Sequence, residues 1–424
     1  MKVFKFGGAS IKDAEAVKNV GEIITGYPDQ KILIVISAVG KSTNKLEEIT
    51  QLYIDSNSEL ASKIATLKKE HINIVESLSN DHKTDETKII FEQLKVDIEK
   101  IFGYLEKLFS NEANQDYDII YDQVVPVGEL LSTKIVSAYL NSINLLNSWT
   151  DARKLILTDS SFRNAEVDWQ LTEMSIQNLE WEENLIVTQG FIGGTKGNFM
   201  TTLGREGSDY SAAIFSNLLN AESLTIWKDV DGVLNADPKF FNNTIKLDNI
   251  SYKEAIELAY FGASVIHPKT IKPVQNKNIP LWVKSFINAN EPGTLINDNT
   301  DKDDEITKYI FKSDQVLMSF SPKDFSFIKE KNISEIFDAL AGQKLEVSTI
   351  QNSAINFSIS VDYDKNKIEK LLQTLQEKYT IKYNQGLELL TIRHFDDEIL
   401  AKLINGRQVF LEQKSRNTVR VLMY

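Results

Sequence analysis

Residues 204–213 read GREGSDYSAA, and they stand between an apolar run and a segment with helical periodicity. The run LIVT at residues 185–188 is followed by the glycine-rich QGFIGG at residues 189–194, and apolar residues at helical spacing begin at Ala213. We predict a strand, a loop and the start of a helix here. Such an arrangement gathers free backbone N–H groups and the positive end of a helix dipole at one place.

Two side chains in this segment suit an anionic ligand. Arg205 offers a planar guanidinium that matches a carboxylate or a phosphate, and Asp209 offers a hard oxygen ligand for Mg²⁺. An ordinary loop followed by a serine helix cap explains the same residues equally well. Other parts of the chain are needed to decide between the two interpretations.

The composition excludes several classes of protein. The length of 424 residues suggests two or three domains, and the hydrophobic fraction of 42% is typical of a globular protein. A net charge of −13 argues against nucleic acid or an anionic membrane as the main partner. The absence of cysteine excludes disulfides, thiolate zinc sites and a cysteine nucleophile. The four histidines show no ligand spacing, so we predict no protein metal site.

The start of the chain and its apolar runs argue against a secreted or membrane protein. Residues 1–8 read MKVFKFGG, a strand that enters a glycine turn and not a signal peptide. No apolar run approaches the roughly 20 residues that span a bilayer. We therefore expect a cytoplasmic protein without a membrane partner.

Lys5 is the first candidate site residue in chain order. We predict a buried strand over residues 3–6 and a helix over residues 13–25. Open α/β sheets bind ligands at the carboxyl ends of their strands, and a lysine inside an apolar strand is costly unless it is paired. A phosphate partner is one interpretation of Lys5, and an edge-strand lysine that points to solvent is the other.

Residues 31–44 predict a second strand, buried on both faces, that ends in small polar residues. Gly40-Lys41-Ser42 matches the end of a P-loop, but the first glycine of that motif would fall at Val35, inside the strand, so we reject the P-loop. Residues 44–110 are helical in pattern, with two apolar stripes that we assign to the core. Another helix begins near residue 126. Glu129 lies in its first turn, where it either receives a ligand ammonium or only stabilises the helix start.

The second half of the chain contains a further candidate nucleotide segment and a change of pattern. Short strands and turns alternate over residues 144–190, and a strand over residues 223–233 ends in an acidic turn. Residues 297–305 read NDNTDKDDE and predict a linker. The order β-α-β-β-α-β follows, which is ferredoxin-like. A second copy begins at Gly386 with a strand, continues with a helix and two strands, and stops without the last helix and strand.

Seven segments, taken together, resemble the aspartate kinases of the amino acid kinase superfamily. They occur in the order of that family. The segments are KFGGAS (residues 5–10), VGELLS (127–132), TQGFIG (188–193), TTLGREGSDY (201–210), KDVDGV (228–233), ADPK (236–239) and FGASVIHP (261–268).

The resemblance implies a fold and a domain organisation. It implies an α/β catalytic domain over residues 1–296, with an open, mainly parallel sheet sandwiched by helices and with a helical segment at 44–110. A linker over residues 297–309 would lead to ferredoxin-like α+β modules of the ACT type. The first module would cover residues 310–385, and a truncated second module would cover residues 386–424.

The resemblance also implies the roles of the site residues. Lys5 and Asp209 would be the catalytic pair, in which Asp209 organises Lys5. Glu129 would receive the substrate ammonium and Arg205 its α-carboxylate. The substrate-binding residues would be Ser37, Thr43, Glu129, Arg205 and Ser208. The nucleotide-binding residues would be Lys5, Gly7, Gly8, Lys228, Asp229 and Lys239, of which Lys5 and Lys239 would bind the ATP phosphates.

Two positions depart from the family pattern. Ala9 stands where threonine is most common, which is a mild change. Ser264 stands where many members have a lysine directed at the phosphates, so one cation is missing there. Lys269 or Lys228 could compensate for it.

The implied activity is the phosphorylation of L-aspartate by ATP and Mg²⁺, which gives 4-phospho-L-aspartate in the first step of lysine, threonine and methionine biosynthesis. The aspartate β-carboxylate, with an ordinary pKa near ~3.9, is already a nucleophile, so no general base is required. Kinases of glutamate, acetylglutamate, carbamate or uridylate are less expected. The alternative from another class is a catalytically weak amino-acid sensor with a decayed kinase domain, which Ser264 favours. We further expect a homodimer through residues 310–424, with weak feedback by lysine or threonine, and no nucleic acid partner.

Overall fold

The computed structural model describes residues 1–81, 84–110, 116–263 and 266–424. These residues form two compact units. The first unit contains Met1–Val233, Lys246–Ile256 and Val265–Thr300. The second unit contains Leu234–Ile245, Glu257–Ser264 and Asp301–Tyr424. Among the described helices, none is both long and apolar enough to cross a bilayer.

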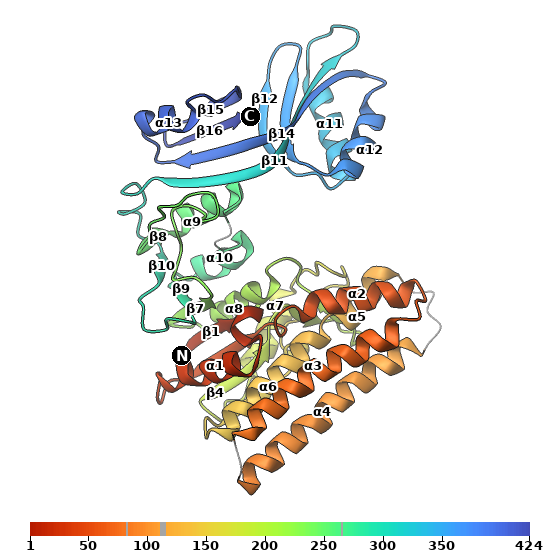
Figure 1. Cartoon of the computed structure of the whole chain (residues 1–424), viewed down its shortest axis with the longest axis vertical. Coiled ribbons are helices and arrows are strands. Elements are labelled where there is room, and N and C mark those ends of the chain that lie inside the picture. The colour runs from red at the N-terminus through yellow and green to blue at the C-terminus, as the bar shows by residue number, and fades with distance from the viewer. Residues whose placement is uncertain (82–83, 111–115, 264–265) are drawn as a thin grey trace. The chain divides into compact units, whose positions relative to one another are not determined.

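The first unit is built on an eight-stranded sheet with the order β3-β4-β2-β1-β7-β9-β10-β8 (Figure 1). Its neighbouring strands pair in parallel, except that β9 and β10 are antiparallel. The predicted open, mainly parallel sheet is therefore confirmed. The strands are β1 (Lys2–Phe6), β2 (Ile32–Ile36), β3 (Asn147–Thr150), β4 (Leu185–Gln189), β7 (Ser223–Lys228), β8 (Asn249–Ser251), β9 (Leu281–Ser285) and β10 (Thr294–Asn297).

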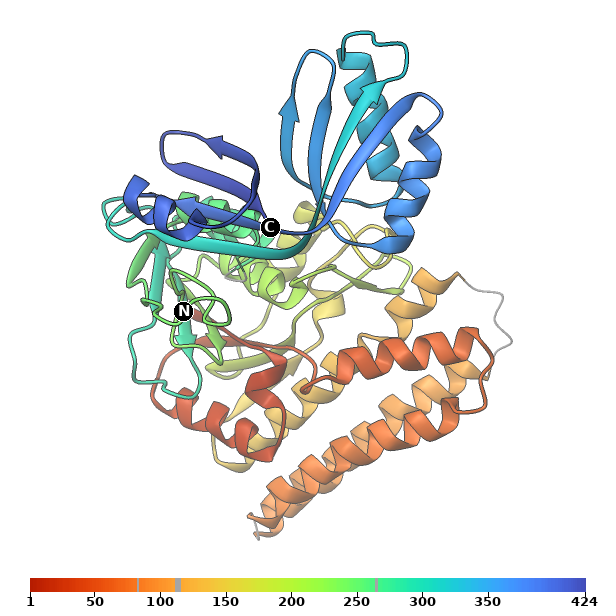
Figure 2. The same ribbon diagram turned by 45° about the horizontal axis from the view of Figure 1, so that its top comes forward.

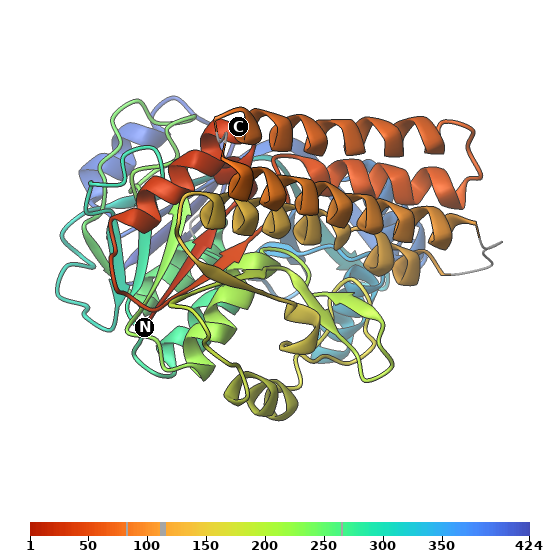
Figure 3. The same ribbon diagram turned by 90° about the horizontal axis from the view of Figure 1, so that it is seen from below.

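Helices cover both faces of this sheet (Figure 3). Every residue of β2 is buried, as expected for a continuous apolar strand between two helical layers. On one face, α6 packs against β2, β3 and β4, and on the other face α8 packs against β1, β2 and β7. The helices of these layers are α1 (Ala14–Thr25), α6 (Val127–Ser142), α7 (Trp169–Gln177), α8 (Gly207–Leu218) and α10 (Pro268–Gln275). The helix α9 (Tyr252–Phe261) begins in the first unit, and its residues from Glu257 on belong to the second.

The helical segment that follows β2 contributes to the same hydrophobic core. It comprises α2 (Ser42–Ile54), α3 (Leu60–Asn80), α4 (Asp85–Phe109) and α5 (Tyr117–Val124). The predicted apolar stripes are buried at Leu67 and Val75 of α3 and at Leu94 and Ile98 of α4, and they pack with residues of α1 and α6. The assignment of the stripes to the core is confirmed.

The helix α7 was not expected from the alternating pattern of residues 144–190. Asp168 caps it by accepting a hydrogen bond from the backbone N–H of Leu171. Only Thr172 and Ile176 of this short helix are buried, so it lacks the long apolar stripe that marks a helix in sequence. The remaining short elements of this unit are the 3₁₀ turns η1 (Gly8–Ile11) and η2 (Ala152–Lys154) and the hairpin β5 (Ile192–Gly194) with β6 (Met200–Thr202).

The second unit is built on a six-stranded antiparallel sheet with the order β12-β13-β11-β14-β16-β15. Its buried residues form one cluster with α11 and α12 and another with α13. The predicted α+β character is confirmed. The elements are β11 (Lys308–Pro322), α11 (Glu330–Gly342), β12 (Val347–Asn352), β13 (Phe357–Asp362), α12 (Lys365–Leu375), β14 (Tyr379–Arg393), α13 (Asp397–Ile404), β15 (Val409–Lys414) and β16 (Thr418–Met423).

The two long strands β11 and β14 pair with each other along their length at the centre of this sheet (Figure 2). Lys308–Lys312 of β11 pair with one half of β14, and Gln315–Pro322 pair with the other half. The predicted module boundary at Gly386 lies inside β14. The division into a complete and a truncated module stays a prediction, and the two halves share their central strands.

Candidate active site

Lys5 lies in the middle of the parallel sheet, near the carboxyl end of β1. Its strand is flanked by β2 and β7, and only 8% of the residue is exposed. Its Nζ lies 2.6 Å from Oδ1 of Asp209. The interpretation of Lys5 as an edge-strand residue that points to solvent is therefore wrong, because a central strand buries it and a carboxylate compensates its charge.

Asp209 projects from the first turn of α8 and lies close to two lysines. Besides its ion pair with Lys5, its Oδ2 lies 4.0 Å from Nζ of Lys228 at the end of β7. Burial alone would raise the pKa of the Asp209 carboxyl, but the charges of Lys5 and Lys228 outweigh this effect and lower the pKa. The carboxylate is therefore ionised and holds two cations in place.

The helix α8 begins without a serine cap. Its N-cap residue is Glu206, which has a left-handed φ of 56° and makes no side-chain cap hydrogen bond. The predicted serine cap of the alternative interpretation is therefore wrong. Gly190 allows the first turn of α8 to lie close to the end of β4, because a Cβ on this glycine would fall 2.6 Å from Cβ of Ser208.

Glu129 is buried in the first turn of α6. Its Oε1 accepts a hydrogen bond of 3.1 Å from the backbone N–H of Ala38, whereas its Oε2 has no hydrogen-bond partner. Burial raises the pKa of the Glu129 carboxyl to about 8. A ligand ammonium at Oε2 would provide both the missing hydrogen-bond partner and the opposite charge. A carboxylate that only stabilised the helix start could lie in solvent and would need neither, so the burial of Glu129 favours the ligand role.

A cavity of about 440 Å³ brings together the predicted catalytic and substrate residues. Lys5, Ser37, Thr43, Glu129, Arg205, Ser208 and Asp209 all line it. Four further side chains line the same cavity and were not singled out from the sequence: Tyr121, Arg163, Phe191 and Glu206. Phe191 and Glu206 fall inside the quoted motifs, whereas no motif marks Tyr121 or Arg163.

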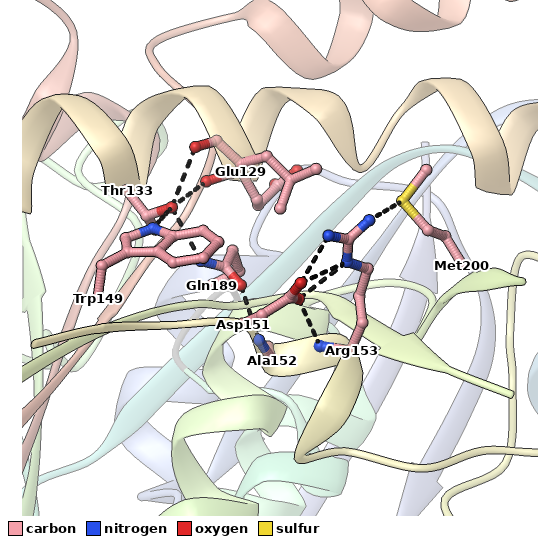
Figure 4. Close-up of polar contacts among 9 residues, drawn as sticks. Glu129, Thr133, Trp149, Asp151, Ala152, Arg153, Gln189 and Met200 are labelled. Carbon is pink, nitrogen blue, oxygen red and sulfur yellow. Dashed lines mark hydrogen bonds and ion pairs between the residues drawn. The ribbon is translucent and has the colours of Figure 1, made fainter. Parts of the chain in front are cut away.

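A hydrogen-bond network fixes the start of α6 against the sheet (Figure 4). Oγ1 of Thr133 donates to the carbonyl of Glu129 at 2.8 Å and accepts from Nε1 of Trp149 on β3 at 3.0 Å. Gln189, at the end of β4, donates to the same Oγ1 at 2.9 Å and accepts from the backbone N–H of Ala152 at 2.8 Å. The position of Glu129 is therefore tied to two neighbouring strands.

The glycine turn after β1 lies at the same end of the sheet. Gly7 caps η1, and a Cβ on Gly8 would lie 2.7 Å from the carbonyl oxygen of Gly40 and 2.8 Å from that of Ala38. No side chain fits at Gly8, because the backbone of the loop after β2 occupies the space that a Cβ would need, and the N–H of Gly40 donates to the carbonyl of Gly8. Such a turn suits a close approach to phosphate.

The predicted nucleotide residues Asp229 and Lys239 do not line this cavity. Asp229 follows Lys228 in an exposed turn of the first unit, and Lys239 is an exposed residue of the second unit. Ser264 lies outside the described residues. Nζ of Lys269 donates to Oδ1 of Asn164 at 2.7 Å, so it is Lys228 that lies beside the Lys5–Asp209 pair. The nucleotide roles of these residues stay predictions.

Comparison with known proteins establishes the family. The chain belongs to the amino acid kinase family, whose model matches residues 1–285. The Zea mays protein named bifunctional aspartokinase/homoserine dehydrogenase 2, chloroplastic, is 29% identical over 388 residues, which cover 89% of this chain and 41% of that protein. Aspartokinase 2, chloroplastic, of Arabidopsis thaliana is 28% identical over 410 residues, which cover 92% of this chain and 73% of that protein.

Solved structures of Escherichia coli aspartokinase III resemble the whole chain. The complex with lysine and aspartate, called the T-state, has a TM-score of 0.80 at 25% identity and covers 100% of this chain and 95% of that one. The complex with aspartate and ADP, called the R-state, has a TM-score of 0.78 at 24% identity and covers 100% and 96%. The chain spans less than half of the length of the Zea mays relative, at 41%.

Proposed function

We propose that the protein is an aspartate kinase, which transfers the γ-phosphoryl group of ATP to the β-carboxylate of L-aspartate. One observation supports this above the others: a buried Lys5–Asp209 pair, a carboxyl group with an open oxygen at Glu129 and the guanidinium of Arg205 line one cavity. The similarity of the chain to proteins named aspartokinases agrees with it.

The substrate assignment follows from charge and hydrogen bonding. Glu129 receives the α-ammonium group at Oε2, which has no partner of its own. Arg205 binds the α-carboxylate through its two-pronged guanidinium. Ser37, Thr43 and Ser208 complete the polar lining.

The nucleotide assignment uses the glycine turn and the lysines. Lys5 binds the phosphates of ATP, Gly7 and Gly8 supply backbone amides, and Lys228 with Asp229 lie by the nucleotide. The phosphate role of Lys239, a residue of the second unit, stays a prediction. In the described part of the chain, no group of three or more His, Asp or Glu could hold a metal ion. Mg²⁺, bound together with ATP, would neutralise phosphate charge.

The chemical step requires no proton transfer from the substrate. An oxygen of the β-carboxylate attacks the γ-phosphorus, and the bond between this phosphorus and the β–γ bridging oxygen breaks. The electron pair of that bond leaves with ADP, and the second product is 4-phospho-L-aspartate. The protein has to neutralise and align two anions, for which Lys5, Lys228 and Arg205 provide positive charge.

A coupled assay of ADP release over a panel of acceptors tests this function. We expect release with L-aspartate and background release with glutamate, acetylglutamate, carbamate and UMP. No release with L-aspartate above the rate without acceptor would contradict the proposal. The sensor alternative depended on Ser264, and the presence of the cations Lys5, Arg205 and Lys228 does not favour it.

The second unit is proposed to carry regulation and assembly. Lysine or threonine acts as an effector at the ACT-like modules and gives weak feedback, and two chains form a homodimer through residues 310–424. The lysine complex of aspartokinase III agrees with an effector role of this kind. The pathway is the synthesis of lysine, threonine and methionine, and a cytoplasmic location stays a prediction.

The substrate roles can be separated from the nucleotide roles by kinetics. Arg205→Lys keeps the charge but loses the two-pronged geometry, and Glu129→Gln loses the charge that faces the ammonium. We expect either change to raise the KM for aspartate by about tenfold, since charge-assisted hydrogen bonds contribute roughly 1.5–3 kcal/mol. The KM for ATP should change little.

Initial rates with each substrate varied in turn give the two KM values. Arg407→Lys is the matched control, because Arg407 lies in the second unit and outside the cavity lining. A raised KM for ATP with an unchanged KM for aspartate would show that the pocket has been assigned to the wrong ligand.

The homodimer is tested by light scattering of the full chain, which should report twice the mass of one chain. The outer strands β12 and β15 expose Ile350 and Val409, and charges on sheet edges prevent pairing. We therefore expect Ile350→Lys combined with Val409→Lys to shift the population towards monomer. The control is Ile89→Lys on α4, which is also exposed but lies in the first unit. A monomeric wild-type chain would contradict the prediction.

A further inference from the structure

Arg163 is a cationic residue of the cavity that no sequence motif marks. It lies in the loop between η2 and α7 and lines the same cavity as Glu129 and Arg205. Its backbone has a left-handed φ of 67°. For a residue with a Cβ this conformation typically costs about 1–2 kcal/mol, so the surrounding structure has to hold it in place.

Buried groups hold the backbone of Arg163. Its N–H donates to Oδ2 of Asp122 at 2.9 Å, and this fully buried carboxylate also accepts from the N–H and Oγ1 of Thr202 at 3.0 and 2.8 Å. Farther along the loop, the N–H of Ala165 donates to the carbonyl of Thr202. The loop is therefore tied to β6, and the unusual backbone of Arg163 is a fixed feature of the fold.

The guanidinium of Arg163 is stacked and oriented. It lies 4.7 Å from the ring centroid of Tyr121 and 5.4 Å from that of Tyr117, and Nη1 donates to Oδ1 of Asp118 at 3.0 Å. Tyr121, which also lines the cavity, is itself fixed by a hydrogen bond of 2.8 Å to Glu47. The side chain of Arg163 is 47% exposed, so the ion pair and the stacking leave about half of its surface accessible.

The loop of Arg163 also contacts the loop that carries Arg205. A Cβ on Gly204 would lie 2.5 Å from Oδ1 of Asn164 and 3.4 Å from the carbonyl oxygen of Arg163. Gly204 has a φ of 76°, so the chain needs glycine here for both space and conformation. The two arginines therefore reach the cavity from loops in direct contact.

We propose that Arg163 is a second substrate-binding arginine, which interacts with the carboxylates of the acidic amino acid and sets the affinity of the site for it. This inference rests on the proposed aspartate kinase function and deepens it. Glycine would suit the backbone at this position better, but it would lack the guanidinium. The strained backbone of Arg163 is thus explained by the guanidinium that this residue provides at the cavity.

The test is the variant Arg163→Gly, which removes the guanidinium and relieves the backbone. We expect the KM for aspartate to rise about tenfold, the low end of the range for a charge-assisted hydrogen bond at a half-exposed site. The kcat and the KM for ATP should stay close to those of the wild type. A purely structural role predicts the reverse, namely a changed Tm with an unchanged KM for aspartate, and this result would overturn the proposal.

Two further variants separate the guanidinium from its neighbours. Arg163→Lys keeps the charge and should recover part of the lost affinity. Asp118→Asn removes only the surface ion pair, so the KM for aspartate should stay near the wild-type value. A rise in Asp118→Asn equal to that in Arg163→Gly would assign the effect to the ion pair and overturn the proposal.

Calorimetric titration with L-aspartate separates failure of this inference from failure of the proposed function. If the wild type binds aspartate without ADP release, the proposed function fails, and the ratio of Kd values between Arg163→Gly and the wild type still tests the role of Arg163. Equal Kd values would overturn that role. A wild type that neither binds nor phosphorylates aspartate would overturn both.

Discussion

Replacement of Lys5 by alanine is expected to lower kcat by roughly 10²-fold or more, because removal of one preorganised charge donor from an active site typically has this effect. Lys5 is buried at the end of a central strand, and its Nζ is held 2.6 Å from Asp209. Its charge is thus in place before the phosphoryl group moves. ADP release at saturating aspartate and ATP measures the loss.

Lys2→Ala is a matched control for this experiment. Lys2 is the first residue of the same strand and does not line the cavity. Its loss should change kcat by no more than about twofold, in line with the small effects of most surface substitutions. Near-normal turnover by a folded Lys5→Ala enzyme would remove Lys5 from the mechanism.

Asp209→Asn is expected to reduce both stability and turnover. The amide has the same size, but it removes the carboxylate that pairs with Lys5 at 2.6 Å and lies 4.0 Å from Nζ of Lys228. Removal of one partner of a buried ion pair typically costs about 3–5 kcal/mol of unfolding free energy. We expect kcat to fall about 10²-fold, because Lys5 loses the group that orients it. Denaturant unfolding and ADP release measure the two effects.

A double variant separates stability from catalysis. Hydrophobic replacement of a buried pair is often neutral or stabilising, so Lys5→Met with Asp209→Leu should recover much of the stability lost in Asp209→Asn. Turnover should stay as low as in the single variants, because residues that act as a unit are not additive. Full activity in Asp209→Asn would show that the carboxylate is not needed to organise Lys5.

The part of the cavity that the sequence predicts is formed by strand ends and helix starts. Lys5 follows from an apolar strand beside a glycine turn, and Glu129 and Asp209 follow from the first turns of predicted helices. These signals are local, and parallel strands bring their carboxyl ends to one edge of the sheet. Local pattern and tertiary placement therefore agree at these three positions.

Arg163 and Tyr121 could not be predicted in the same way. Their approach to the cavity depends on how α5 and the loop before α7 pack, which no periodicity encodes. A left-handed backbone at an arginine has no sequence signal, because the favoured residues there are glycine, asparagine and aspartate. No sequence pattern marks Asp122 either, although its buried carboxylate holds the backbone of Arg163.

In the C-terminal sheet, the local structure around Gly386 could not be predicted from the sequence either. Gly386 resembles a turn residue in sequence, and its φ of 69° is indeed unusual for a strand. However, β14 continues through it, and the register with β11 shifts between Gln315 and Leu317, opposite this glycine. A bulge therefore accommodates the glycine, and a sequence pattern does not distinguish a bulge from a chain reversal.

The burial of Glu129 makes the proposed substrate site a proton-linked one. Burial raises the pKa of this carboxyl to about 8, so in the ligand-free protein at neutral pH it is mostly protonated. An ammonium group binds the ionised form, so aspartate binding would release a proton below this pH and become tighter as the pH rises towards 8. Acidification alone would then lower substrate occupancy without any effector. The affinity of the site for aspartate would therefore depend on the pH around the protein.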